Sequence, residues 1–297
     1  GSREVPRYHA PVTEAQAHVP LGVRVRLGHA AVQKVADDLG LRLLHVKGYA
    51  LDESLSWPGR VGTDVDIIVH PADVDALLAG LEGAGWCLQT GFEWGSAFGH
   101  AATLEHRDWG YVDVHRFYPG LGPDAARSFD ILWATRQCRE LAGYPCAVPN
   151  LDGQILTLLL HAGRTHASPK AVRDVEEAWH EATPERRAAV EALVRRLGAE
   201  VGFAAAVGDL EAYRHRPEYR LWRVWSRGGT RLQEWRARIA AAPTPGAKAS
   251  VILRAPLVNV QHLAIVLDRE PGPLDIAREF VARPLRGLRE AFRRRPS

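Results

Sequence analysis

The sequence predicts an α+β fold in two parts, a mixed sheet flanked by helices over residues 1–149 and a mostly helical part over residues 150–297. Apolar runs with strand and helix spacing alternate in the first part, which indicates a mixed sheet. Three- and four-residue apolar spacing persists through the second part. Charge divides the chain at the same place, because residues 1–149 carry 13 basic and 18 acidic side chains whereas residues 150–297 carry 25 and 17. An acidic part suits metal ions, and a basic part suits an anionic partner such as a triphosphate or a nucleic acid.

The elements of the first part follow from apolar periodicity and from breaking residues. Gly40 ends the first helix, Pro58-Gly59 ends the second, and Pro71 lies in the first turn of the third. In chain order we expect a helix over 27–40, a strand over 41–46, a short helix over 49–57, a strand over 64–69, a helix over 71–85, a strand near 86–92, and a hairpin of 101–106 with 111–117.

The second part reads as successive helices with prolines at their starts and glycines at their ends. We expect them over residues 152–166, 170–182, 184–198, 217–226 and 231–242, followed by a linker "APTPGAKA" and a last helical pair. Trp222, Trp225 and Trp235 have helical spacing and are interleaved with arginines, which favours a packed aromatic face over a surface that stacks a base. The basic tail, residues 278–295, is typical of a terminal helix.

Composition excludes several classes of protein. With 297 residues, 46% hydrophobic and 25% charged, the chain is typical of a soluble globular protein with room for two cores of about 150 residues each. The three cysteines lack C-x-x-C spacing, which argues against a disulfide framework and a zinc site. The longest apolar stretch contains Arg254 and Pro256 and falls short of a membrane span. The opening residues show no secretory signal, so we expect a cytoplasmic protein.

Two aspartates, Asp64 and Asp66, stand at the start of the apolar strand "DVDIIV". Side chains alternate along a strand, so both carboxylates project to one face and repel each other unless a cation, most simply a divalent ion, lies between them. In "YVDVHRF", Asp113 and His115 likewise share a face. If the two strands are neighbours, Asp113 completes a triad that can hold two Mg²⁺ ions about 3.5 to 4 Å apart, with Mn²⁺ as an alternative. That arrangement is suited to nucleotidyl transfer.

Lys47-Gly48 lies at the end of the strand over 41–46 and before a short helix. A backbone at that place can approach phosphates, although a simple turn glycine explains Gly48 equally well. Lys47 can reach a phosphate or pair with Asp64 or Asp66. Both roles stay open at this point.

Together, "HVKGYALDESLSWPGRVGTDVDIIV" and "YVDVHRF" resemble the nucleotidyltransferase superfamily related to DNA polymerase β, in its bacterial branch of uncharacterised nucleotidyltransferases. The resemblance covers roughly residues 30 to 120 and implies a polymerase-β-like domain. It implies that Gly48 cradles the triphosphate, that Asp64 and Asp66 bind the metals, that Asp113 serves the attacking hydroxyl, and that Arg60 contacts a phosphate or is structural.

One departure from that family concerns the loop, which has Gly48-Tyr49 where most members have Gly-Ser or Gly-Gly. We count Lys47, Gly48, Tyr49, Arg60 and His115 as candidate nucleotide-binding residues, and Lys47, Arg60 or a basic residue of the helical part must compensate for the missing hydroxyl. His115 has three open roles: orienting Asp113, acting as a base, or making a supporting hydrogen bond.

A weaker resemblance extends into the helical part, where the family has a histidine on one helix and an aspartate on the next. His161 and Asp174 match these two residues, either as a hydrogen-bonded pair that fastens the helices or as part of an acceptor site. His100 and His106 are expected at the surface of the hairpin.

These observations favour an enzyme that moves a nucleoside monophosphate from a nucleoside triphosphate to a hydroxyl acceptor with release of pyrophosphate, the acceptor being a small molecule or natural product. A transferase acting on the 3′ end of a tRNA or another RNA is an alternative, as is a non-catalytic module that retains the fold. A D-x-D glycosyltransferase fits less well, since it needs about 100 residues of nucleotide-binding unit before the motif and has no need for Asp113.

Overall fold

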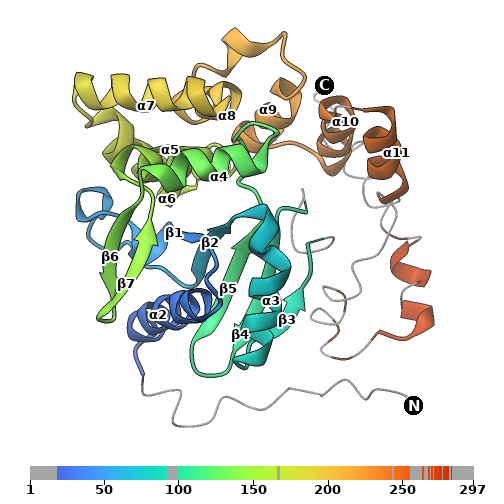
Figure 1. Ribbon diagram of the computed structural model, residues 1–297. Coiled ribbons are helices and arrows are strands. Elements are labelled where there is room, and N and C mark those ends of the chain that lie inside the picture. Colours follow the sequence, from blue (N-terminus) through green and yellow to red (C-terminus); the bar gives the residue numbers. More distant parts are fainter. Residues whose placement is uncertain are drawn as a thin grey trace.

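The computed structural model describes residues 19–92, 99–165, 168–242 and 244–254, together with single residues and short runs between 263 and 282 (Figure 1). The N-terminal extension, most of the predicted last helical pair and most of the basic tail lie outside the described residues. Among the described helices, none is both long and apolar enough to cross a bilayer.

A mixed five-stranded sheet forms the first part, as predicted. Its spatial order is β1-β2-β5-β4-β3, and β2 and β5 run parallel while the other pairs are antiparallel. The strands are β1 Leu43–Val46, β2 Val65–Val69, β3 Cys87–Thr90, β4 Ala101–His106 and β5 Gly110–His115. The sequence therefore located every strand of this sheet, although β3 at its edge is largely exposed while the other four strands bury apolar residues.

Alternation along β2 gives the sheet two different faces. Val65, Ile67 and Val69 belong to a core with α2 (Leu21–Leu39) and α3 (Val74–Gly83), whereas Ile68 belongs to a second core shared with the helical part. Asp66 lies on the same face as Ile68 because the two are separated by two positions. The carboxylate face of the sheet is thus the face that the helical part covers (Figure 1).

Some helices differ from their predicted bounds. Helix α2 ends at Leu39, directly before Gly40, as predicted, and Gly40 adopts the left-handed conformation. The helix begins at Leu21 instead of residue 27. The helix expected over 49–57 is instead two 3₁₀ turns, Gly48–Ala50 and Glu53–Leu55, with Asp52 capping the second through the Ser54 amide. The helix expected over 71–85 is a 3₁₀ turn, Pro71–Asp73, followed by α3.

Four further elements were not predicted: α4 Ala125–Ala134, β6 Gln137–Leu141, β7 Tyr144–Val148 and α8 Glu200–Val207. The β6–β7 hairpin turns through Ala142 and Gly143, which both have positive φ. Ala-Gly is a poor signal for such a turn, which usually begins with Asn, Asp or Gly. Helix α8 is short and apolar on all sides, so it lacks the amphipathic spacing on which the prediction relied.

The helical part contains, in chain order, α5 Leu151–Ala162, α6 Pro169–Val175, a π-helical turn Glu176–His180, α7 Pro184–Leu197, α8, a 3₁₀ turn Leu210–Tyr213, α9 Tyr219–Arg227, α10 Arg231–Ala241 and α11 Pro245–Arg254. Asn150, Ser168, Thr183 and Thr230 cap four of these helices with their side chains. Helix α11 begins inside the stretch that was predicted as a linker, because Pro245 at its first turn starts a helix as readily as it ends a loop. Trp222 is buried and packs edge-to-face on Trp225, which confirms the packed aromatic face for this pair.

One hydrophobic core crosses the predicted boundary at residue 150. Leu156, Leu159 and Leu160 of α5 pack in it with Val46 and Ile68 of the sheet. The division into two domains at that residue stays a prediction, and the shared core shows that the two parts bury surface against each other.

A buried histidine pair lies between α2 and β1. The Nδ1 atoms of His29 and His45 are 2.8 Å apart, and Nε2 of His45 is 3.2 Å from Oε1 of Gln33. Because the Gln33 oxygen can only accept, His45 carries its proton on Nε2 and accepts on Nδ1 the proton of His29. Burial lowers the pKa of His29 to about 4, with the charge of Asp66 acting in the opposite direction.

Candidate active site

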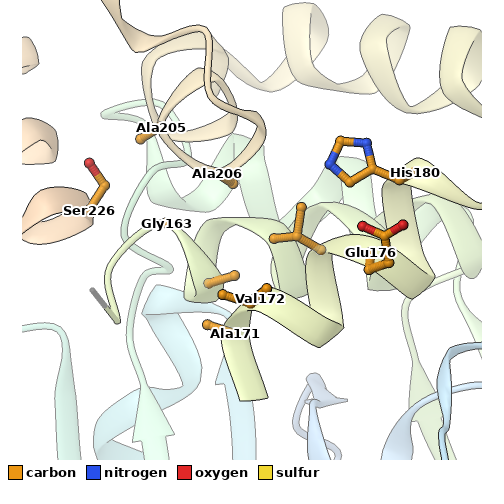
Figure 2. A pocket seen from close by; sticks show the side chains of 10 residues that line it. Gly163, Ala171, Val172, Glu176, His180, Ala205, Ala206 and Ser226 are labelled. Atoms are coloured by element: carbon orange, nitrogen blue, oxygen red, sulfur yellow. The ribbon is translucent and has the colours of Figure 1, made fainter. Parts of the chain in front are cut away.

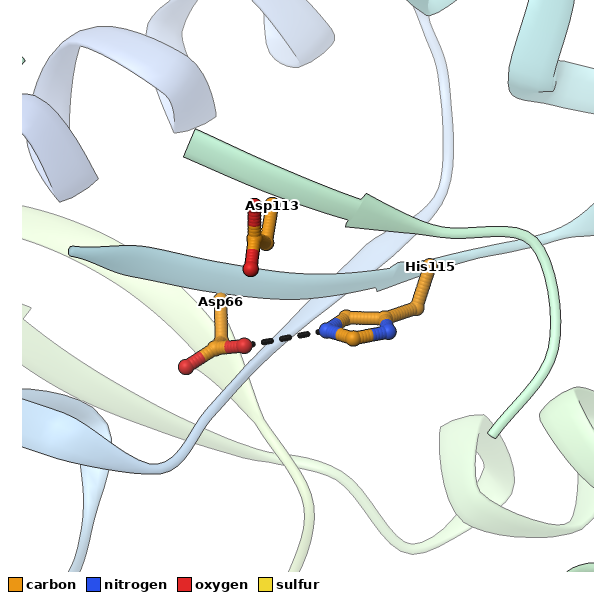
Figure 3. Close-up of side chains that lie close together, drawn as sticks. All are labelled: Asp66, Asp113 and His115. Carbon is orange, nitrogen blue, oxygen red and sulfur yellow. Dashed lines mark hydrogen bonds and ion pairs between the residues drawn. The ribbon is translucent and has the colours of Figure 1, made fainter. Parts of the chain in front are cut away.

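The parallel pairing of β2 with β5 brings the predicted carboxylates together. Asp66 lies directly opposite Asp113 in the register, so the expected neighbourhood of the two strands is confirmed. Asp66, Asp113 and His115 each offer one ligand atom, and these atoms lie within 4.8 Å of one another (Figure 3). Asp66 and His115 are buried, at 5% and 3% exposure. Among the described residues this compact group does not include Asp64.

Asp66 is the centre of the local hydrogen bonding. Its Oδ1 accepts from Nζ of Lys47 at 2.5 Å and lies 2.9 Å from Nε2 of His115. Burial by itself raises the pKa of Asp66, but the Lys47 ammonium and the His115 hydrogen bond outweigh it and hold that pKa well below its usual range. The pairing of Lys47 with Asp66, one of its two predicted roles, is therefore confirmed.

His115 orients Asp66 and not Asp113, in contrast to one of the roles predicted for it. The reason is the register, in which Asp113 faces Thr103 of β4 and Oδ1 of Asp113 accepts from the Thr103 hydroxyl at 2.6 Å. Each carboxylate is thus fixed by a side chain from a neighbouring strand or loop. Such fixed carboxylates hold their oxygen atoms ready for a cation.

Asp64 stands just before β2 and is half-buried. Its Oδ1 accepts from the Thr63 hydroxyl at 3.1 Å. Burial raises the pKa of Asp64, and the charges of Asp66 and Asp113 raise it further against the opposing charge of Lys47. Burial is the largest cause of this rise, and a cation bound beside Asp64 would relieve the repulsion that Asp66 and Asp113 add.

The Lys47-Gly48 loop has an unusual backbone. Lys47 has φ 59° and ψ −170°, a region that residues with a side chain rarely adopt, and Gly48 has φ 50°. Gly62 presses on this loop, because a Cβ at Gly62 would lie 3.1 Å from the Gly48 Cα and 3.2 Å from the Tyr49 ring. The close approach of two glycines holds the loop against the start of β2, within reach of Asp66.

Tyr49 packs against α2. The Arg26 guanidinium lies 4.3 Å from the centre of its ring, and its hydroxyl would lie 2.5 Å from a Cβ placed on Gly22. The structure thus accounts for Tyr49 by packing, and contact with a nucleotide stays a prediction for Tyr49 and for Gly48.

Arg60 makes a buried ion pair with the helical part. Its Nε and Nη2 donate to Asp174 of α6 at 2.9 and 3.1 Å, and Trp57 donates to the same carboxylate at 2.9 Å. The Arg60 and Asp174 side chains are 4% and 1% exposed. Arg60 is therefore a structural contact, one of its two predicted roles, while a phosphate contact stays a prediction. The pairing of His161 with Asp174, one of the two roles predicted for them, is wrong because Trp57 and Arg60 bind that carboxylate instead, while a role in an acceptor site stays a prediction.

Besides Lys47, the site has a second cation, Arg164, which was not predicted from the sequence. Arg164, two residues after α5, lies with Nη1 3.5 Å from Nε2 of His100 and with its guanidinium 5.4 Å from the Tyr118 ring centre. Burial and the charges of Lys47 and Arg164 lower the pKa of His161 well below its usual value. The sequence did carry a signal for Arg164, which is a basic residue directly after the apolar helical run "LLLHAG".

His100 is buried, at 8% exposure, and not on the hairpin surface as predicted. Its ring stacks on His115 with centroids 5.3 Å apart. Burial, followed by the charges of His115, Arg164 and Lys47, lowers the pKa of His100 to about 2. His100 is therefore neutral at physiological pH and can accept a hydrogen bond from Arg164.

The donor set fits a hard divalent ion such as Mg²⁺ or Mn²⁺. Two carboxylates and an imidazole supply oxygen and nitrogen ligands, and the Lys47 ammonium already occupies this place as a cation. Nε2 is the His115 nitrogen that faces the carboxylates, whereas Nδ1 lies on the far side of the ring (Figure 3).

A separate hollow of about 240 Å³ lies in the helical part and shares no residue with the carboxylate group. Most of its wall is small or apolar. Figure 2 shows Glu176 and His180 at one end and Ser226 at the other. The lining residues are Ala162, Gly163, Ala171, Val172, Val175, Glu176, His180, Ala205, Ala206 and Ser226.

Comparison with known proteins identifies one matching family, described as uncharacterised nucleotidyltransferase, over residues 29–208. The match includes the sheet, the carboxylates and the helices through α8. No curated protein matches the chain.

Several solved structures are similar to this chain. The lincosamide antibiotic adenylyltransferase LnuA with lincomycin bound is 15% identical, with a TM-score of 0.35 over 56% of this chain and 96% of that one. The antibiotic-resistance factor ANT(2'')-Ia is 17% identical, with a TM-score of 0.37 over 64% and 95%. An antigenic nucleotidyltransferase-like protein from Paracoccidioides brasiliensis is 19% identical, with a TM-score of 0.37 over 70% and 100%. These values are too low to transfer a substrate to this chain.

Proposed function

The chain belongs to the uncharacterised nucleotidyltransferase family, and on that premise we propose that it is a metal-dependent enzyme that moves a nucleoside monophosphate from a nucleoside triphosphate to a hydroxyl acceptor. The observation that carries this proposal is the convergence of Asp66, Asp113 and His115 from two parallel strands, with Asp64 close enough to sense their charge.

In this proposal Asp64, Asp66 and Asp113 hold two Mg²⁺ ions, and His115 keeps Asp66 in position. When bound, the ions neutralise charge on the triphosphate and on the attacking oxygen. Asp113 accepts the proton of the acceptor hydroxyl on Oδ2, since Thr103 holds Oδ1. The hydroxyl oxygen forms a bond to the α-phosphorus, the bond from that phosphorus to the bridging oxygen breaks, and pyrophosphate leaves with the electron pair.

Basic side chains from both parts are proposed to bind the phosphates. Gly48 offers its backbone N–H at the positive-φ turn, and Lys47 and Arg164 supply charge. Arg60 is less suited to this role because its guanidinium is already bound to Asp174. Arg164, which the helical part contributes, is therefore the proposed phosphate-binding residue in place of Arg60.

The acceptor is proposed to be a small hydroxylated molecule or natural product bound on the side of the helical part. The hollow beside Glu176 and His180 is below the usual 300 to 1,000 Å³ of a ligand pocket, so it suits one group of an acceptor and not a whole large molecule. The net basic charge of residues 150–297 favours the 3′ end of an RNA as second candidate. Affinity that falls steeply with salt distinguishes the RNA, because several phosphates are neutralised at once.

The test measures pyrophosphate release and label transfer. The protein is incubated with each α-labelled nucleoside triphosphate, Mg²⁺ and a cell extract, and the label is followed into small molecules, peptides and RNA. We expect Asp113→Asn to abolish transfer at an unchanged melting temperature, whereas the control Asp38→Asn, on an exposed aspartate paired with Lys34, keeps full activity. Transfer by Asp113→Asn at the normal rate would remove the assignment.

A further inference from the structure

Lys47 places its ammonium on the carboxylate oxygen that a divalent ion needs. Nζ lies 2.5 Å from Oδ1 of Asp66, and the two side chains are only 14% and 7% exposed. We propose that Lys47 is a built-in counter-ion that competes with the divalent ion for Asp66, and that ion binding releases it toward the phosphates of the nucleotide. This inference rests on the proposed function, since it deepens the role of one residue at the same site.

The charges of the site support competition. Asp64, Asp66 and Asp113 carry three negative charges when ionised, and the Lys47 ammonium neutralises one of them. The remaining two match a single divalent ion, so two ions beside a bound ammonium would leave a strong positive excess until a triphosphate arrives. An ammonium and a divalent ion on one buried carboxylate also repel each other strongly, because little water screens them.

The backbone conformation of Lys47 indicates that the surrounding structure holds this residue in place. Its φ of 59° with ψ −170° is strained for a residue with a side chain and persists only where the surroundings enforce it. Gly62 packs on the following Gly48 and so holds the loop in place. The loop fixes the Cα of Lys47 while the long side chain retains the freedom to leave Asp66.

A destination for the released ammonium exists on the same side of the sheet. Arg164 lies near this site, because its Nη1 is 3.5 Å from Nε2 of His100, the His100 ring stacks on His115, and His115 and Lys47 both contact Oδ1 of Asp66. Lys47, once it has left Asp66, and Arg164 then present two cations to phosphate oxygens. Ion binding at Asp66 thus increases the affinity for a triphosphate, and by reciprocity a triphosphate increases the affinity for the ion.

Mn²⁺ binding to the nucleotide-free protein tests the competition, with free Mn²⁺ measured by electron paramagnetic resonance. We expect Lys47→Met to bind Mn²⁺ about tenfold more tightly than the native protein, because the competing charge is gone. Lys47→Arg keeps a competing cation and should stay within about twofold of the native protein. Lys34→Met removes an exposed lysine paired with Asp38 and is the matched control. Inorganic triphosphate should bind Lys47→Met less tightly in the presence of Mn²⁺.

The native protein offers a second measurement that does not depend on a variant folding. Its lysines are labelled with an amine-reactive reagent and the sites are quantified by mass spectrometry. Labelling of Lys47 should rise severalfold on saturation with Mn²⁺ and fall again when inorganic triphosphate is added, while labelling of exposed Lys34 stays constant. Unchanged labelling of Lys47, or native Mn²⁺ affinity in Lys47→Met, overturns this inference alone. No Mn²⁺ binding by any form overturns the metal-dependent function itself, so the two failures are distinguishable.

Discussion

The ion pair between Arg60 and Asp174 joins the sheet to the helical part, and we predict that breaking it destabilises the whole chain. Two hydrogen bonds of 2.9 and 3.1 Å connect the side chains, which are 4% and 1% exposed. Removing one partner of a buried pair leaves the other charge without compensation, which costs about 3 to 5 kcal/mol. For a chain of this size that corresponds to a melting temperature lower by roughly 6 to 20 °C.

The assay is a double-mutant cycle by urea denaturation. Arg60→Met and Asp174→Leu should each lower the free energy of unfolding by this amount, and the double variant should lose much less than the sum of the two. Arg195→Met, which breaks a surface contact to Glu191, is the control and should cost less than about 1 kcal/mol. If Arg60→Met instead loses under 1 kcal/mol and mainly raises the KM for the nucleotide, the structural role assigned to Arg60 is wrong.

Three further predictions concern acidity, the loop and the carboxylates. Between pH 6.5 and pH 4, His29 is protonated in the unfolded chain but neutral in the folded one, because the folded-state pKa is about 4, so the free energy of unfolding should fall by up to about 3 kcal/mol across this range. Urea midpoints that are equal at pH 7 and pH 4.5 would contradict this. Gly62→Ala should raise the KM for the nucleotide severalfold in initial-rate assays, because the new Cβ would lie 3.1 Å from the Gly48 Cα and would move the Lys47-Gly48 loop. A normal KM would show that the loop tolerates the added methyl group. Asp66→Asn should weaken Mn²⁺ binding at least about tenfold more than Asp64→Asn does, because Asp64 lies outside the group of Asp66, Asp113 and His115. Calorimetry that shows the reverse order would make Asp64 the principal ligand.

Much of the first part could be predicted because its signals are local. The period of two in "DVDIIV" fixes which residues share a face of β2, and Gly40 marks the end of α2 by its left-handed conformation. Elements without such a signal were missed, such as α8 with no polar face and the hairpin that turns through Ala142 and Gly143.

The sequence by itself determined the strands of the sheet and which of their residues share a face, because alternation and breaking residues depend on positions a few residues apart. The pairing of β2 with β5, which brings Asp66 opposite Asp113, came from the tertiary structure. Only the tertiary structure decided which side chains bind those carboxylates. Lys47 and His115 bind Asp66, Thr103 binds Asp113, and Arg60 binds an aspartate more than 100 positions away. Strand order and register set the first three of these partnerships, and the packing of the helical part on the sheet sets the last. A charged side chain that the fold buries must bond with a group that the fold places within reach.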